Sequence, residues 1–185
     1  MSKSALKILE TAEMLFNQNS FNSVGVDLIR DQSGCSKTTL YTYYKNKSQL
    51  IGAVLSERDL HFKHSLFNYL DYAQGQEAIH KILDWHIQWF KEDTFKGCLF
   101  VRAVAESNTE DQTIIMIAQH HKQWIKELIW KYCPQENRPL IAELIYTLIE
   151  GLISRFLVDG YNETVVQHIK ISIDKILFCF SDIKA

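Results

Sequence analysis

The sequence predicts an all-α protein, and three observations indicate this fold class. The chain of 185 residues contains only 2 prolines and 7 glycines, whereas strand-rich folds use these residues at many turns. Hydrophobic residues make up 46% of the chain, which is enough to form a sizeable core. Apolar residues also recur at the spacing of amphipathic helices, and we expect about nine helices in total.

The first two predicted helices cover residues 4–18 and about 26–33. Residues 4–18 place apolar side chains on one face and charged side chains on the opposite face. The second helix starts at Gly25 or Asp27. It ends at Gly34, because glycine adopts the left-handed conformation of a helix end at little cost.

A third helix is predicted at 36–47, with Ser36 as its N-cap. The order of helix, tight turn containing Gly34 and second helix is typical of a helix-turn-helix. We therefore place an N-terminal three-helix domain of this kind at residues 1–46.

The remaining residues, 47–185, are predicted to form a C-terminal helical bundle. Its loops are marked by the turn-forming stretches DYAQGQ, CPQENRP and DGYNE, and the second of these contains both prolines of the chain. The helices expected here are 48–69, 76–92, 97–106, 110–132, 139–158 and 163–181.

Charge and cysteine content limit the class of protein. The net charge is −2, but residues 1–64 carry 8 Lys or Arg against 6 Asp or Glu, so the N-terminal part is mildly basic and the rest acidic. The 4 cysteines are far apart, which favours a reducing compartment. Without a leader-like or membrane-spanning run, we expect a soluble, cytoplasmic protein with no membrane partner.

The third predicted helix has the polar groups that a DNA-reading helix needs. The major groove admits one helix, and the first turn of such a helix contacts bases and phosphates. Threonine groups can contact base edges, and phenol hydroxyls and ammonium groups bind phosphate. The candidate contact residues are Lys37, Thr38, Thr39, Tyr41, Thr42, Tyr43 and Lys47. The alternative is an exposed helix whose tyrosines pack on a neighbouring protein.

Residues from about Ile8 to Leu55 resemble the N-terminal domain of the TetR family of transcriptional regulators. The resemblance rests on the stretches ILETAEMLFNQNSF and VDLIRDQSGCSKTTLYTYYKNKSQLIGAVL. It differs from the family pattern at some positions, such as Gly25 in place of a hydroxyl cap and Tyr44 in place of Phe. The positions that the family uses on operator DNA correspond to Ser36, Lys37, Thr38, Thr39, Tyr41, Thr42, Tyr43 and Lys47.

The resemblance implies a homodimer that binds a palindromic operator and is released by a small molecule. The C-terminal body, 47–185, would then hold the ligand-binding and dimerisation functions. Aromatic side chains with a few polar groups could line a pocket there, although ordinary core packing explains any one of them. The candidate pocket residues are Trp85, His86, Trp89, Phe100, Arg102, His121, Trp124 and Tyr146. Arg102 interrupts an apolar run, so it either extends to solvent, which we favour, or binds an anion.

Cys98 is a candidate sensor of oxidants or electrophiles, because a thiolate beside Lys96 at a helix start would be reactive. The alternative is an inert, buried thiol. The histidine pairs His61–His64 and His120–His121 lack further ligands at suitable spacing, so we expect no metal and no cofactor.

The last two predicted helices have apolar residues on more than one side. One side can serve the protomer's own core and the other a two-fold partner, which predicts a homodimer through these helices. No catalytic constellation is found, so we expect a ligand-responsive DNA-binding repressor and not an enzyme. The alternatives are a helical protein-interaction module without DNA binding and a Cys98-based sensor on the same fold.

Overall fold

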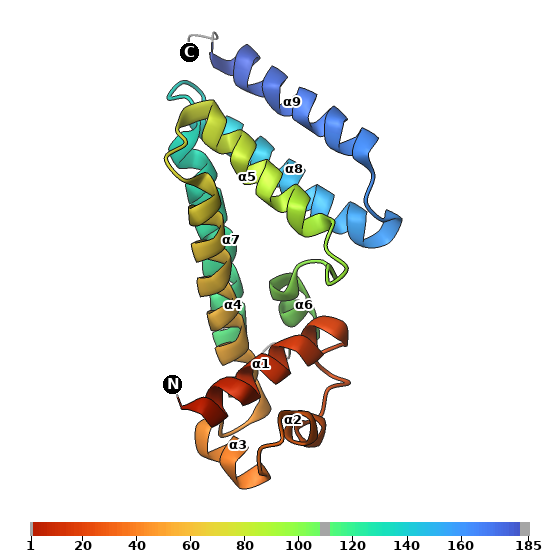
Figure 1. The fold of residues 1–185 in the computed structure, drawn as a ribbon. Coiled ribbons are helices and arrows are strands. Elements are labelled where there is room, and N and C mark those ends of the chain that lie inside the picture. Colours follow the sequence, from red (N-terminus) through yellow and green to blue (C-terminus); the bar gives the residue numbers. More distant parts are fainter. Residues whose placement is uncertain (1, 108–111, 182–185) are drawn as a thin grey trace. The chain divides into compact units, whose positions relative to one another are not determined.

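The computed structural model of the chain describes residues 2–107 and 112–181, apart from the side chains of Phe180 and Ser181. These residues form nine α-helices and no strand, so the all-α prediction is confirmed (Figure 1). In chain order the helices are α1 (Lys3–Gln18), α2 (Val26–Ser33), α3 (Lys37–Tyr43), α4 (Lys47–Leu70), α5 (Gly75–Phe90), α6 (Leu99–Glu106), α7 (Gln112–Tyr132), α8 (Arg138–Asp159) and α9 (Glu163–Ser181).

The helices belong to two compact units. Unit 1 comprises Met1–Phe62 and Cys98–His121, and unit 2 comprises Lys63–Gly97 and Lys122–Ala185. The long helices α4 and α7 therefore contribute residues to both units. The domain boundary predicted between residues 46 and 47 stays a prediction.

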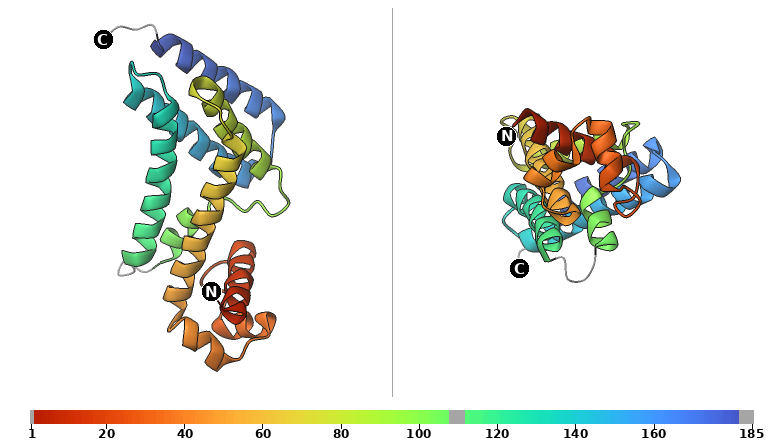
Figure 2. Two further views of the ribbon diagram at one scale, coloured as in Figure 1. Left: turned by 60° about the vertical axis from the view of Figure 1, so that its left-hand side comes forward. Right: turned by 90° about the horizontal axis from the view of Figure 1, so that it is seen from below.

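The helix ends in the first part of unit 1 follow from their capping residues. The Ser2 hydroxyl accepts a hydrogen bond from the Ala5 N–H at 3.2 Å and so starts α1. The helix predicted at 36–47 ends earlier, at Tyr43, and a short turn leads into α4 (Figure 2, left). This turn is fixed because the Asn46 side chain accepts a hydrogen bond from the Gln49 N–H at 2.8 Å.

Unit 1 has a continuous apolar core. Ile8, Phe16, Ile29 and Leu40 are buried together and hold α1, α2 and α3 against one another. Leu50 and further residues of α4 extend the same cluster, as do residues of α6 and α7. Each of these side chains contributes about 1.5–3 kcal/mol through burial, so the orientation of α3 is set by its apolar side.

Unit 2 is built from α5, α8 and α9 with the adjoining parts of α4 and α7. Helix α5 packs on α8 and α9, and α8 packs on α9 (Figure 1). The buried residues of these helices include Ile82, Ile145, Leu152 and Ile173. No helix in the described ranges is long and apolar enough to cross a membrane.

Candidate functional site

The α2–α3 turn brings a short polar helix to the surface of unit 1. Gly34 ends α2 with a φ of 64°, which is the left-handed conformation that favours glycine. Ser36 is the N-cap of α3, as predicted, and its hydroxyl accepts a hydrogen bond from the Thr39 N–H at 3.0 Å. Leu40 is buried on the inner side of α3. The outer side is thereby left to polar residues.

Most of the predicted contact residues are exposed. Tyr41 and Tyr43 are 41% and 43% exposed, and among the described residues their hydroxyls have no hydrogen-bond partner. Thr39 and Lys47 are half-buried. The other exposed residues of this set are Ser36, Lys37, Thr38 and Thr42. These exposed groups form one surface of unit 1, which we call the α3 surface.

Several groups on the α3 surface already have partners. The Lys37 ammonium lies 3.1 Å from the Asp27 carboxylate, and this hydrogen bond holds the pKa of Asp27 below its ordinary value. The Thr42 hydroxyl donates to the Thr38 carbonyl at 2.8 Å. Lys37 would therefore have to exchange a carboxylate for a phosphate on binding DNA.

Lys47 lies in a different setting from the rest of this set. It opens α4 and lines a hollow of about 170 Å³ within unit 1, together with residues that include Phe21 and Glu106. Burial lowers the pKa of the Lys47 ammonium, and the negative charge of Glu106 opposes this shift. Whether Lys47 contacts DNA stays a prediction.

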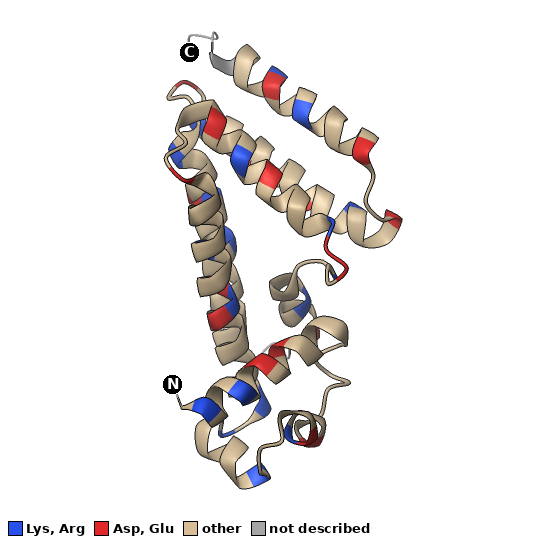
Figure 3. Cartoon of the chain, viewed as in Figure 1, with Lys and Arg blue, Asp and Glu red and all other residues tan. Residues whose placement is uncertain are grey.

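Sequence reasoning passed over Lys45, although it lies in the turn between α3 and α4. Lys45 is exposed, and its backbone N–H donates to the Gln49 side chain at 3.1 Å. Lys and Arg segments also lie on α1, on α2 and in this turn (Figure 3). The nearby Tyr44 is buried, and its hydroxyl donates to the Ala5 carbonyl at 3.3 Å. The basic pattern KNK could have indicated Lys45 as a further phosphate ligand.

The predicted pocket residues divide between the two units. In unit 1 the rings of Phe100 and His121 are stacked, with centroids 3.7 Å apart and an interplanar angle of 10°. The Nδ1 atom of buried His121 lies 2.8 Å from the Asp59 carboxylate, and Phe62 contacts the imidazole edge-on. These four residues join α4, α6 and α7.

Arg102 corrects the expectation of a solvent-exposed side chain. Its Nη2 group donates to the carbonyl of Phe16 and, at 3.2 Å, to that of Asn17, at the end of α1. One turn later on α6, the Glu106 carboxylate accepts a hydrogen bond from the Asn22 N–H at 3.1 Å. The apolar residues around Arg102 in the sequence suggested a side chain that extends to solvent. It turns to the end of α1 instead, because the last backbone carbonyls of a helix need hydrogen-bond donors. Helix α6 therefore holds the end of α1 and the α1–α2 loop.

In unit 2, Trp85, His86 and Trp89 form an aromatic group on α5. His86 is only 1% exposed, and its Nδ1 atom lies 2.7 Å from the Ile82 carbonyl. The pKa of His86 is lowered to about 4, chiefly by burial; the Ile82 hydrogen bond opposes this shift, and the charge of Lys122 adds to it. His86 is thus neutral at pH 7.

The structure reveals a charged pair within unit 2 that sequence reasoning missed. The Lys122 ammonium on α7 lies 2.7 Å from both carboxylate oxygens of Glu150 on α8. The two side chains are only 19% and 24% exposed. Trp124, two residues along α7, contacts Phe67 edge-on, and the predicted pocket residue Tyr146 on α8 is half-buried. Both helices carry several charged residues, so no signal in the sequence could have indicated that these two form a pair.

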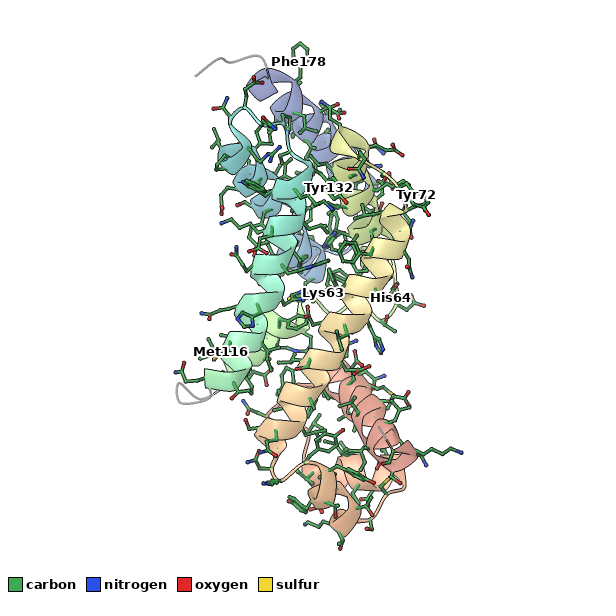
Figure 4. All side chains as sticks on the ribbon, turned by 90° about the vertical axis from the view of Figure 1, so that its left-hand side faces the viewer. Lys63, His64, Tyr72, Met116, Tyr132 and Phe178 are labelled. Atoms are coloured by element: carbon green, nitrogen blue, oxygen red, sulfur yellow. The ribbon has the colours of Figure 1, made fainter. Side chains whose placement is uncertain are left out.

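Lys63 and Trp124 also lie together in unit 2. The Lys63 ammonium is 5.2 Å from the centre of the Trp124 ring, which is within the range of a cation–π interaction. Lys63 and His64 occur in consecutive positions of α4, labelled in Figure 4.

Cys98 is the N-cap of α6, and its side chain is half-buried against the core of unit 1. Its role as a sensor stays a prediction. Among the residues that the structure describes, no group of three or more His, Cys, Asp or Glu could hold a metal ion.

Helices α8 and α9 leave apolar side chains in water in addition to those they bury. Val158 and Leu157 on α8 are 80% and 51% exposed, and Phe178 on α9 is 71% exposed. The Phe178 ring projects away from the ribbon at the end of α9 (Figure 4). Such side chains mark a surface that a partner could cover.

Comparison with known proteins identifies the N-terminal segment. Residues 8–54 match the family model described as bacterial regulatory proteins, tetR family. No curated protein matches the chain.

Many solved structures share the fold. A TetR-family transcriptional regulator from Streptomyces coelicolor, SCO4454, has a TM-score of 0.82 and 19% identity, over 97% of this chain and 96% of that one. The reduced form of Escherichia coli NemR has a TM-score of 0.78 and 18% identity, over 95% of this chain and 97% of that one. A cysteine mutant of the TetR-family regulator CifR was solved in complex with 26-base-pair operator DNA. It has a TM-score of 0.79 and 15% identity, over 94% of this chain and 96% of that one. These structures share the fold over nearly the whole chain. The family match confirms, for residues 8–54, the resemblance to the TetR family found in the sequence.

Proposed function

We propose that this TetR-family chain is a ligand-responsive repressor, which binds a palindromic operator as a homodimer and is released by a small molecule. The observation that carries the proposal is the α3 surface. Its tyrosine and lysine groups are held outward by a helix whose opposite side is anchored by Leu40. A helix of this kind fits the major groove, and its polar groups are suitable ligands for phosphates and base edges.

Most groups on the α3 surface have a proposed task, and so does the half-buried Thr39. The N-terminus of α3 and Lys37 provide positive charge for phosphate, and the Tyr41 and Tyr43 hydroxyls donate to phosphate oxygens. Thr38 and Thr39 contact base edges. Because each neutralised phosphate releases counterions, the logarithm of affinity should fall with log[salt] by about 0.9 per contact.

The homodimer is proposed to form through α8 and α9. Their exposed apolar residues, such as Val158 and Phe178, would be removed from water by the same surface of a second copy. A two-fold axis between the copies would set the spacing of the two operator half-sites. The dimer therefore converts one weak protein–DNA contact into two that act together.

The effector is proposed to bind in the body, where buried polar groups lie among aromatic rings. His86 and the Lys122–Glu150 pair in unit 2 offer hydrogen-bonding groups, and Trp85 and Trp89 offer flat apolar surface. An effector changes DNA affinity only if it binds two conformations of the protein unequally. The contacts of Arg102 and Glu106 with the end of α1 and the α1–α2 loop are the proposed route by which α6 affects the DNA-binding helices.

The test begins with selecting the genomic fragments that the purified protein binds at low salt. The double variant Lys37→Ala/Tyr43→Ala is then compared with the parent chain on a selected fragment. We expect at least about a tenfold loss of affinity and a smaller salt slope, because a charged phosphate contact and a neutral one are removed. The control is Tyr72→Ala, which removes a tyrosine that is 90% exposed on unit 2.

Size-exclusion chromatography with light scattering reports whether each variant remains a dimer. If the parent protein binds no DNA at low salt, the DNA-binding proposal is wrong and a protein-interaction module becomes the better explanation. If Tyr72→Ala weakens binding as much as the double variant, the α3 surface is not the DNA contact.

A further inference from the structure

One end of unit 2 contains a hollow that takes no part in the proposed function. The hollow measures about 350 Å³ and is lined by residues from the start of α5, the end of α7, the α7–α8 loop and the start of α8. Figure 1 shows the α4–α5 turn and the α7–α8 loop at the same end of unit 2. Its walls come from residues 74–76, residues 131–135 and Arg138. None of the predicted pocket residues lines it. We call this feature the α7–α8 hollow.

Arg138 is held in place within this hollow through its Nε group, and its terminal nitrogens remain available as hydrogen-bond donors. Its Nε group donates to the carbonyls of Cys133 at 3.1 Å and Pro134 at 3.4 Å. Its guanidinium also lies 4.6 Å from the centre of the Trp130 ring, which is within the range of a cation–π interaction. The two terminal nitrogens have no protein partner among the described residues. An arginine with its stem fixed and its outer donors available is well suited to an oxyanion, which accepts two parallel hydrogen bonds.

A second cation lines the same hollow. Lys131 lies over the Tyr132 ring, with its ammonium 5.0 Å from the ring centre. Within the described part of the chain, neither Lys131 nor Arg138 forms an ion pair with an Asp or Glu. Two cations that line the same hollow repel each other, so an anion bound between them would lower the electrostatic energy.

Residues 74–76, on another side of the hollow, add hydrogen-bond donors and no acidic side chain. Gln74 and Gln76 contribute side-chain amides, and Gly75 begins α5 without a side-chain cap. The acidic residue of that first turn, Glu77, lies 4.0 Å from Lys81 on its own helix and is not part of the wall.

From the cavity and its two unpaired cations, we propose that the α7–α8 hollow binds a small oxyanion, such as a phosphate or carboxylate group. Arg138 would supply a fork of two donors, Lys131 a mobile charge, and the glutamine amides further hydrogen bonds. The site is separate from the α3 surface and from the proposed effector pocket, so the proposal does not depend on the proposed function.

Isothermal titration of the full chain, without DNA, tests the proposal. The probes are inorganic phosphate and acetate, each at the ionic strength of a sodium chloride reference. We expect one saturable site per chain for at least one probe. Lys131→Gln and Arg138→Gln should each weaken binding by about tenfold or more, since each removes a charge-assisted hydrogen bond. The probe that binds more tightly shows whether phosphate or carboxylate is preferred.

Two control variants make the outcome decisive. Lys175→Gln removes one exposed lysine from α9 in the same unit and should leave binding unchanged. Lys37→Ala tests whether phosphate binds the α3 surface instead. The proposal is overturned if neither probe saturates, if Lys131→Gln has no effect, or if Lys37→Ala alone removes binding. Because Lys131 is exposed, Lys131→Gln keeps the test valid even if Arg138→Gln fails to fold.

Discussion

The polar groups on the α3 surface and those inside unit 2 differ in their access to water. Lys37 and its partner Asp27 are 52% and 62% exposed, so water screens their attraction. Lys122 and Glu150 are mostly buried, and His86 is fully enclosed. A surface group can exchange one partner for another at small cost, whereas a buried group without its partner is strongly destabilising. The first arrangement suits reversible contact with DNA, and the second suits a site that must stay formed.

The largest expected effect comes from breaking the buried pair. Lys122→Met would leave the Glu150 carboxylate without its cation, and we expect the free energy of unfolding to fall by about 3 kcal/mol. Urea denaturation followed by circular dichroism measures the loss. The double variant Lys122→Met/Glu150→Leu should recover most of it, because an apolar pair requires no buried charge. Equal stability of the single variant and the parent would show that water reaches this pair freely.

His86 should make the stability of the protein depend on pH. Its pKa is about 4 in the folded chain, below the ordinary 6.5, so the unfolded chain binds a proton first as the pH falls. The contribution is therefore fully present above about pH 6.5 and is lost as the pH falls towards 4. We expect a loss of about 2 kcal/mol between pH 7 and pH 5.

Urea denaturation of the parent chain and of His86→Gln across this pH range isolates the contribution. The glutamine variant can still donate to the Ile82 carbonyl but does not titrate, so its stability should vary less. Parallel pH profiles for the two proteins would rule out His86 as the cause.

The smallest effect concerns the exposed pair on the α3 surface. Asp27→Asn removes the carboxylate that holds Lys37, and we expect DNA affinity at low salt to rise about two- to threefold. Fluorescence anisotropy with a selected operator fragment measures the change. The advantage should disappear at high salt, where exposed charges are screened. A fall in affinity would mean that Asp27 positions Lys37 for DNA and does not compete for it.

The N-terminal part could be predicted in detail because its signals are local. Ser36 caps α3 and Gly34 ends α2, and both positions follow from the preferences of single residues within a few positions of chain. The exposure of Tyr41, one residue after Leu40, follows from the helical position of Leu40, which must face the core. The end of α3 at Tyr43 was less predictable, because it depends on the competing start of α4 at Lys47.

By itself, the sequence determined the helical class, the order of the helices and the motif that carries the family resemblance. Only the tertiary structure decided that Arg102 bonds to carbonyls at the end of α1, that Lys122 meets Glu150, and that Arg138 and Lys131 line one hollow. The physical reason is the distance along the chain over which each interaction acts. Helix periodicity and capping act between residues a few positions apart, whereas burial and charge pairing depend on which distant helices pack together.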